Sequence, residues 1–199
     1  MSRPAARLTR LYLDSRDTGR TLILLAAAAA VLRASQPVTR NTGVFSQVTL
    51  MIVTLGAAAV IAAATRTPFG EAERTASSPL PALRLIHLAI LTAVATATVA
   101  VAAWTASYGI GATAILRNLA GFTGIALITA GLLGAHHAWT APLAYVVYCG
   151  GELDAQVYSL WNWPILPAGN HAAAAIAVSL LIAGITLITI TGARDRQND

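Results

Sequence analysis

The sequence predicts an all-α, polytopic integral membrane protein with about six transmembrane helices, for three reasons. Apolar residues make up 56 % of the 199 residues, charged residues make up only 11 %, and the mean hydropathy is +0.66. Soluble domains carry about 25 % charged residues, so this chain has too few polar groups to cover a surface that faces water. Several uncharged stretches approach the roughly 20 residues that cross a bilayer, and arginines flank them. This composition excludes a soluble globule, a disordered chain and a disulfide scaffold, and indicates one transmembrane domain over residues 1–199.

The apolar stretches differ in length. Clear spans are predicted at residues 48–65, 86–106, 119–135 and 171–192. Residues 21–32 form a weaker candidate between Arg20 and Arg33, whose side chains can reach opposite interfaces and so lengthen the span. Residues 141–150 are shorter still, and predict either a short fifth span or a re-entrant half-helix.

The arginines indicate the orientation. All 13 basic residues are arginine. With the N-terminus in the cytoplasm and six crossings, ten arginines lie on the inner side and three, Arg33, Arg40 and Arg117, lie on the outer side. Cytoplasmic loops carry an excess of arginine, so this topology is favoured and both termini are expected in the cytoplasm. The positive charge then faces the inner membrane surface, and we expect no nucleic-acid partner.

Two segments are expected on the cytoplasmic side. Residues 5–20 predict an amphipathic helix that lies in the membrane interface, or that also docks on a cytoplasmic partner. Residues 66–84 form the largest inner loop. They are either a solvated connector or a short helix that carries force to a soluble subunit.

The segment before the last span is expected on the outer side. Residues 141–170 join the short fifth span to the sixth, and contain Glu152 and Asp154, the only acidic residues on that side. Trp161, Ile165 and their apolar neighbours predict that this segment dips back into the outer leaflet. Irregular backbone survives there only where protein or a cavity covers it.

The fourth span carries a stripe of glycines. Residues that share one helical face are Gly121, Gly124, Gly131 and Gly134. Small residues let helices approach closely, so this stripe predicts either packing within the chain or a subunit interface. Arg117 precedes the span, and we expect it at the outer interface or along a wet path, because an arginine in hydrocarbon is costly.

Catalytic chemistry is sparse in this sequence. HExxH, CxxC and GxSxG motifs are absent, the predicted clear spans contain no Asp or Glu, and Cys149 has no cysteine to pair with. A P-loop requires lysine, and the chain has none. We therefore expect no metal site, no cofactor and no enzymatic activity in this chain.

Four features together resemble the membrane subunit of an ATP-binding-cassette exporter of the drug- and polysaccharide-export permease class. They are the interfacial helix, the charged turn FGEAER at residues 69–74, the six spans and the re-entrant outer segment. Residues 117–145 (RNLAGFTGIALITAGLLGAHHAWTAPLAY) are also similar to actinobacterial permeases of this kind. The chain departs from the class in its short length and its cramped first and fifth spans.

The resemblance implies a bacterial plasma membrane complex. Two membrane subunits, identical or different, would each sit on a soluble ATPase that holds ATP and magnesium. Residues implied to face that ATPase are Phe69, Glu71, Glu73 and Arg74. Residues implied to line the substrate path are Tyr145, Tyr148 and Trp161. The cargo is expected to be hydrophobic or peptide-like.

Two other functions fit the sequence. The first is a non-transporting accessory or immunity subunit that packs on another membrane protein through the glycine stripe. A small membrane enzyme that uses His136 and His137 is the third hypothesis.

Overall fold

A computed structural model describes residues 18–40, 43–65, 80–104, 108, 110–155 and 158–191. The regular secondary structure in these ranges is helical throughout. The elements are α2 (Thr18–Ala34), α3 (Gln36–Thr39), α4 (Val44–Ala63), α6 (Leu80–Trp104), α7 (Ala112–Leu133), η1 (Ala135–His137), α8 (Thr140–Asp154), η2 (Leu160–Ile165) and α9 (His171–Thr191).

Four of these helices are long and apolar enough to cross a membrane. They are α4, α6, α7 and α9, and each coincides with one of the four clear spans of the sequence. The predicted starts were too late for α4, α6 and α7. The prediction began the fourth span at residue 119, whereas α7 begins at Ala112 and includes Arg117 within the helix.

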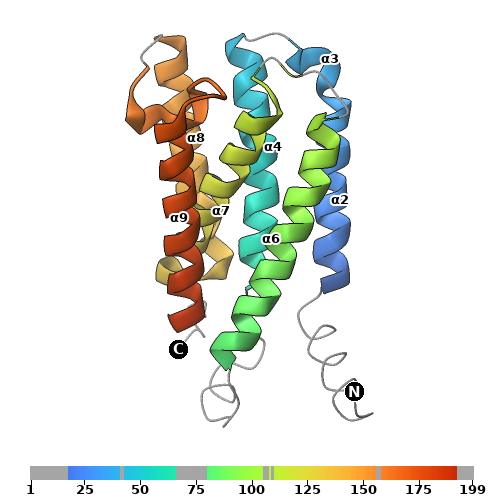
Figure 1. The fold of residues 1–199 in the computed structure, drawn as a ribbon, viewed down its shortest axis with the longest axis vertical. Coiled ribbons are helices and arrows are strands. Elements are labelled where there is room, and N and C mark those ends of the chain that lie inside the picture. Colours follow the sequence, from blue (N-terminus) through green and yellow to red (C-terminus); the bar gives the residue numbers. More distant parts are fainter. Residues whose placement is uncertain are drawn as a thin grey trace.

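The two weaker stretches are also helical. α2 has 17 residues and α8 has 15, which at 1.5 Å per residue gives about 25 and 22 Å, compared with about 30 Å of hydrocarbon. α8 continues through Gly150 and Gly151 to Asp154, beyond the end predicted at residue 150. Both helices lie alongside the longer ones in the bundle (Figure 1).

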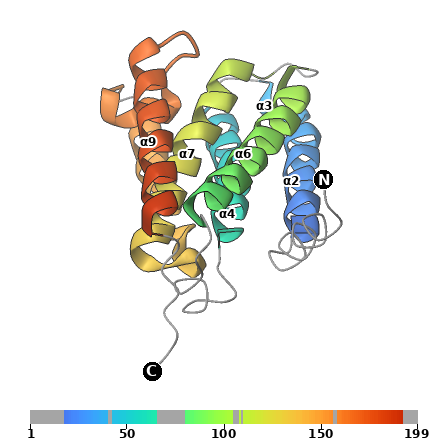
Figure 2. The ribbon, with the colours of Figure 1, turned by 60° about the horizontal axis from the view of Figure 1, so that its bottom comes forward.

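Successive helices α2, α4, α6, α7, α8 and α9 alternate in direction along the chain, so α7 and α9 run parallel to each other (Figures 1 and 2). α7 lies in the middle, between α8 and α9 on one side and α2 and α6 on the other. α2 begins and α9 ends at the same end of the bundle, where α4 also ends and α6 begins. α7 begins at the opposite end, beside η2 and α3. We call this the Arg117 end.

Helix ends follow from local residue choices. Gly111 and Gly134 flank α7 with φ angles of +80° and +97°, a region that side chains with a Cβ rarely adopt. Asn170 precedes α9, and its Oδ1 accepts a hydrogen bond from the backbone N–H of Ala173 at 2.9 Å. This is the side-chain cap that asparagine supplies at a helix N-terminus.

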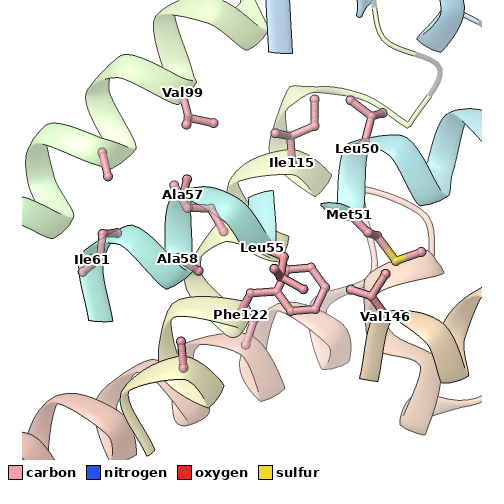
Figure 3. Close-up of a cluster of buried hydrophobic side chains, with 14 of the residues drawn as sticks. Leu50, Met51, Leu55, Ala57, Ala58, Ile61, Val99, Ile115, Phe122 and Val146 are labelled. Atoms are coloured by element: carbon pink, nitrogen blue, oxygen red, sulfur yellow. The ribbon is translucent and has the colours of Figure 1, made fainter. Parts of the chain in front are cut away.

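The apolar core forms where α4 crosses α7. Phe122 and Ile115 of α7 are fully buried, and Leu50, Met51 and Ile61 along α4 belong to the same buried cluster (Figure 3). α6 contributes Val99 and α8 contributes Val146 to the same cluster; the other labelled members are Leu55, Ala57 and Ala58. α7 therefore packs against α4, α6, α8 and α9, whereas α2 packs on α4 and α6. α7 positions the side chains at the Arg117 end.

The structure describes only parts of the two segments that were expected on the cytoplasmic side. Of the interfacial helix at 5–20, the structure describes residues 18–20, which are the first turn of α2 rather than part of a separate helix. The inner loop expected at 66–84 is shorter than predicted, because α6 already begins at Leu80. Residues 66–79, with the charged turn, lie outside the described residues.

Candidate functional site

A short irregular segment closes the Arg117 end between α8 and α9. We define residues 160–167 as the cap segment; it contains the 3-10 helix η2. Asn162 interrupts the helical geometry with φ −101° and ψ 36°, and Pro164 lies inside it. Asn162, Trp163, Pro164 and Ile165 are buried. The cap segment is therefore folded into the bundle and covered by protein, although Leu160 and Trp161 remain exposed.

Arg117 of α7 holds the end of the cap segment. Its Nη2 donates to the carbonyl oxygens of Pro164 at 3.1 Å and Leu166 at 2.8 Å, and its Nη1 donates to that of Pro167 at 3.0 Å. Its Nε donates to Oδ1 of Asn118 at 3.3 Å, and Nδ2 of Asn118 donates to Pro164 at 3.0 Å. Two adjacent side chains thus bind three carbonyls that follow one another closely in sequence.

This arrangement solves two desolvation problems together. Backbone carbonyls in an irregular segment lack the regular partners of a helix, and a buried carbonyl without a hydrogen bond is costly. Of the three carbonyls, that of Pro167 also accepts a hydrogen bond from the backbone N–H of Asn170 at 3.0 Å. Arg117 is only 7 % exposed, and a buried guanidinium also needs acceptors. Hydrogen bonds from a charged donor are roughly twice as strong as neutral ones. The sequence placed Arg117 at the outer interface or along a wet path; in the structure, backbone carbonyls of the cap segment accept its hydrogen bonds inside the protein.

Trp163 wedges the cap segment against α7. Its ring lies directly over Gly121, where an added Cβ would come within 2.1 Å of Cη2. The indole is 2 % exposed, and its centroid lies 5.6 Å from that of Phe122 and 6.1 Å from that of Tyr145. The glycine at 121 therefore provides the space that the indole fills.

The three residues predicted to line the substrate path differ in their contacts and in their exposure. Tyr145 of α8 donates its hydroxyl hydrogen bond to the carbonyl of Trp161, and its ring stacks on Tyr148 at 6.1 Å. Tyr148 is half exposed, and the indole of Trp161 is 80 % exposed. The rings of Tyr145 and Tyr148 stack on each other, whereas Tyr145 contacts Trp161 only through the backbone carbonyl of Trp161. Trp163, two residues after Trp161, is the buried indole.

The glycine stripe of α7 is covered within the same chain. An added Cβ would come within 2.3 Å of the Leu180 backbone at Gly124, and within 2.9 Å of the Leu187 side chain at Gly131. Both contacts are with α9. Gly134 has a different role, since it ends α7 with a positive φ. Helix α9 of the same chain therefore covers this face, so the stripe does not offer the exposed surface that a subunit interface requires.

Sequence reasoning missed Arg117 and Asn118 as site residues. The available signal was an Arg-Asn pair at the start of a glycine-rich helix, combined with an apolar, proline-containing segment elsewhere in the chain. The implied ATPase-facing residues Phe69, Glu71, Glu73 and Arg74 lie outside the described residues.

Metal chemistry finds no support in the residues that the structure covers. They include no group of three or more His, Cys, Asp or Glu side chains able to hold a metal ion. His136 and His137 are exposed in η1, their ring centroids 5.2 Å apart, at the end of the bundle opposite the cap segment. His171 begins α9 at the Arg117 end.

Searches for similar proteins were negative. No family model, curated protein or solved structure matches this chain.

Proposed function

We propose that this chain is the membrane-spanning subunit of an ATP-binding-cassette transporter that exports a hydrophobic or peptide-like compound. A separate soluble ATPase subunit binds ATP and magnesium and supplies the energy. The observation that carries the proposal is the cap segment, folded between α8 and α9 and fastened to α7. A plain helical bundle has no need of a buried irregular closure at one end, whereas a transport path does.

The proposal includes six spans, with α2 and α8 as the first and fifth. Arg20 and Arg33 are both exposed near the two ends of α2, where long side chains reach the interfaces. The even number of crossings fits the common end at which α2 begins and α9 ends (Figure 1). The excess of arginine assigns that end to the cytoplasm, so the chain resides in the bacterial plasma membrane with both termini inside.

The substrate path is proposed along α8 and beneath the cap segment. Tyr145 and Tyr148 offer stacked aromatic faces with little charge, and Trp161, whose carbonyl accepts from the Tyr145 hydroxyl, adds an exposed indole. Such surfaces suit an apolar or aromatic cargo. The cap segment then acts as the re-entrant outer closure expected from the sequence.

The ATPase is proposed to bind at the opposite end. α4 ends at Ala63 and α6 begins at Leu80 there, so the intervening loop emerges at the end away from the cap segment. Its charged turn supplies Phe69, Glu71, Glu73 and Arg74 for the contact. A second membrane subunit, identical or different, completes the transporter.

Co-purification tests this proposal. The affinity-tagged chain, extracted in mild detergent from its native cells, should bring down a soluble P-loop ATPase whose hydrolysis is coupled to the complex. The double variant Glu71→Ala/Arg74→Ala should lose the ATPase, whereas the matched double variant Arg33→Ala/Arg40→Ala at the other end should retain it. A complex without an ATPase and without nucleotide-stimulated activity would contradict the proposal.

A further inference from the structure

We propose that the cap segment is a lid that opens and closes, and that Arg117 is the latch that holds it shut. This inference rests on the proposed transport function for its purpose, but it concerns a movement that is measurable in the isolated chain. Arg117 acts here as a positioning residue, because it touches the lid and no cargo.

The hydrogen bonds that fasten the lid to its neighbours are ones that water or another polar group can replace. Arg117 and Asn118 bind its carbonyls from α7, and the hydroxyl of Tyr145 binds the carbonyl of Trp161 from α8. Nδ2 of Asn162 lies 3.5 Å from Oε2 of Glu152, also on α8. Each tie uses at least one side chain, so the lid can leave α7 and α8 without breaking a backbone hydrogen bond of either helix.

Arg117 contributes the strongest of these ties. It supplies a full positive charge, and each hydrogen-bond acceptor that the structure assigns to it is a neutral oxygen. Opening the lid removes three of these acceptors at once, and a guanidinium left without acceptors in an apolar setting is costly. The closed lid is therefore the resting state. It opens only when water or a polar group of the cargo takes over the guanidinium hydrogen bonds.

The chain carries its own reporter of this movement. Tyr145, Cys149 and Glu152 have spacings of four and three along α8 and so share one helical face, and both outer members of this set contact the lid. Cys149 lies between them, is fully buried, and is the only cysteine in the sequence. Its reaction with a thiol reagent therefore requires local opening at this face.

The experiment measures the rate at which N-ethylmaleimide labels Cys149 in the full chain reconstituted in lipid nanodiscs. Wild type should react slowly. Arg117→Met should react at least about tenfold faster, since about 1.4 kcal/mol of lost closure gives that factor. Arg117→Lys keeps the charge and should give an intermediate rate, whereas Arg40→Met, an exposed arginine at the same end, should match wild type.

Two further variants separate a latch from general loosening. Gly131→Ala strains the contact between α7 and α9 away from the lid and should leave the labelling rate near that of wild type. Asn118→Ala removes one tie to Pro164 and should accelerate labelling less than Arg117→Met; it also serves as the test if Arg117→Met does not fold.

The inference is overturned if folded Arg117→Met or Asn118→Ala labels no faster than Arg40→Met, or if Gly131→Ala accelerates labelling as much as they do. No ATPase takes part in this measurement. A chain that shows the latch but never binds an ATPase would leave the lid standing and remove the transport proposal.

Discussion

Gly184 of α9 packs directly against the backbone of Gly124 of α7. A Cβ built on Gly184 would lie 2.6 Å from the carbonyl oxygen of Gly124 and 3.1 Å from its Cα. Both neighbours are backbone atoms, so the contact cannot adjust by turning a side chain. The approach of these two helices depends on the absence of two Cβ atoms, and the first prediction follows from it.

Alanine at either glycine should destabilise the protein. Overpacking in a tight contact costs about 1–3 kcal/mol, and Gly184→Ala and Gly124→Ala should fall in that range or above it. Gly56→Ala in α4 is the control, because nothing lies within 4 Å of its added Cβ. Thermal unfolding in detergent, followed by circular dichroism, should show a lower Tm for the first two variants only. Equal Tm values for Gly184→Ala and Gly56→Ala would contradict the close approach.

A double-mutant cycle should couple Gly121 to Trp163. Gly121→Ala places a Cβ within 2.1 Å of the indole and should destabilise the chain on its own. Trp163→Phe also destabilises, since it leaves a gap over the glycine. The double variant should be more stable than the sum of the two losses, because the smaller ring vacates the space that the Cβ needs. Strict additivity of the two unfolding free energies would indicate that the indole lies elsewhere.

Tyr108→Phe should weaken the attachment of α2. The Tyr108 hydroxyl is buried and donates to the carbonyl of Leu32 at 3.0 Å, which links the segment before α7 to the end of α2. One such bond contributes about 0.5–1.5 kcal/mol, and the loss should appear in the unfolding free energy. Tyr158→Phe, at an exposed tyrosine, is the control and should change little.

The same tyrosine should make stability depend on alkaline pH. Burial raises the pKa of Tyr108 above its ordinary value of 10.0, and the nearby Arg33 opposes that rise. The fold therefore favours the neutral hydroxyl. Its contribution is complete below about pH 10 and is lost as the pH rises through the raised pKa. The stability difference between wild type and Tyr108→Phe should narrow in that range. A difference that stays constant between pH 8 and 11 would argue against burial of the hydroxyl (about one unit on each side of the ordinary tyrosine pKa).

Cysteine accessibility in whole cells should test the six spans. In a Cys149→Ser background, an impermeant thiol reagent should label Thr42→Cys and Ala168→Cys from outside, but not Ser2→Cys or Gln197→Cys. Lysis should make the last two reactive. Labelling of both Ser2→Cys and Thr42→Cys from one side would mean that α2 does not cross the membrane.

Composition and periodicity predicted the helical membrane class and the four longest helices. The starts of α6 and α7 were predicted too late because Arg84 and Arg117 were treated as ends of spans. Arg117 lies inside α7, where the carbonyls of Pro164, Leu166 and Pro167 accept its hydrogen bonds. Those carbonyls lie far away in sequence, so no local pattern identifies them.

The glycines show a similar limit. Their spacing indicated one close-packed face, but the partner was undecided between this chain and another. The structure gives α9 and Trp163 as the neighbours of that face. Trp161 and Trp163 lie two residues apart with similar surroundings in sequence, yet Trp161 is exposed and Trp163 is buried, with the irregular backbone of Asn162 between them.

The tight contact between α7 and α9 also has a thermodynamic signature. When the two helices are apart, lipid tails rather than water cover their facing surfaces. Separating the helices within the bilayer therefore transfers little apolar surface into water. The heat-capacity change for that step should therefore be small compared with that of a soluble domain of this size. The pair is held mainly by van der Waals attraction at short range, and its strength should respond to the shape and packing of the surrounding lipid more than to temperature.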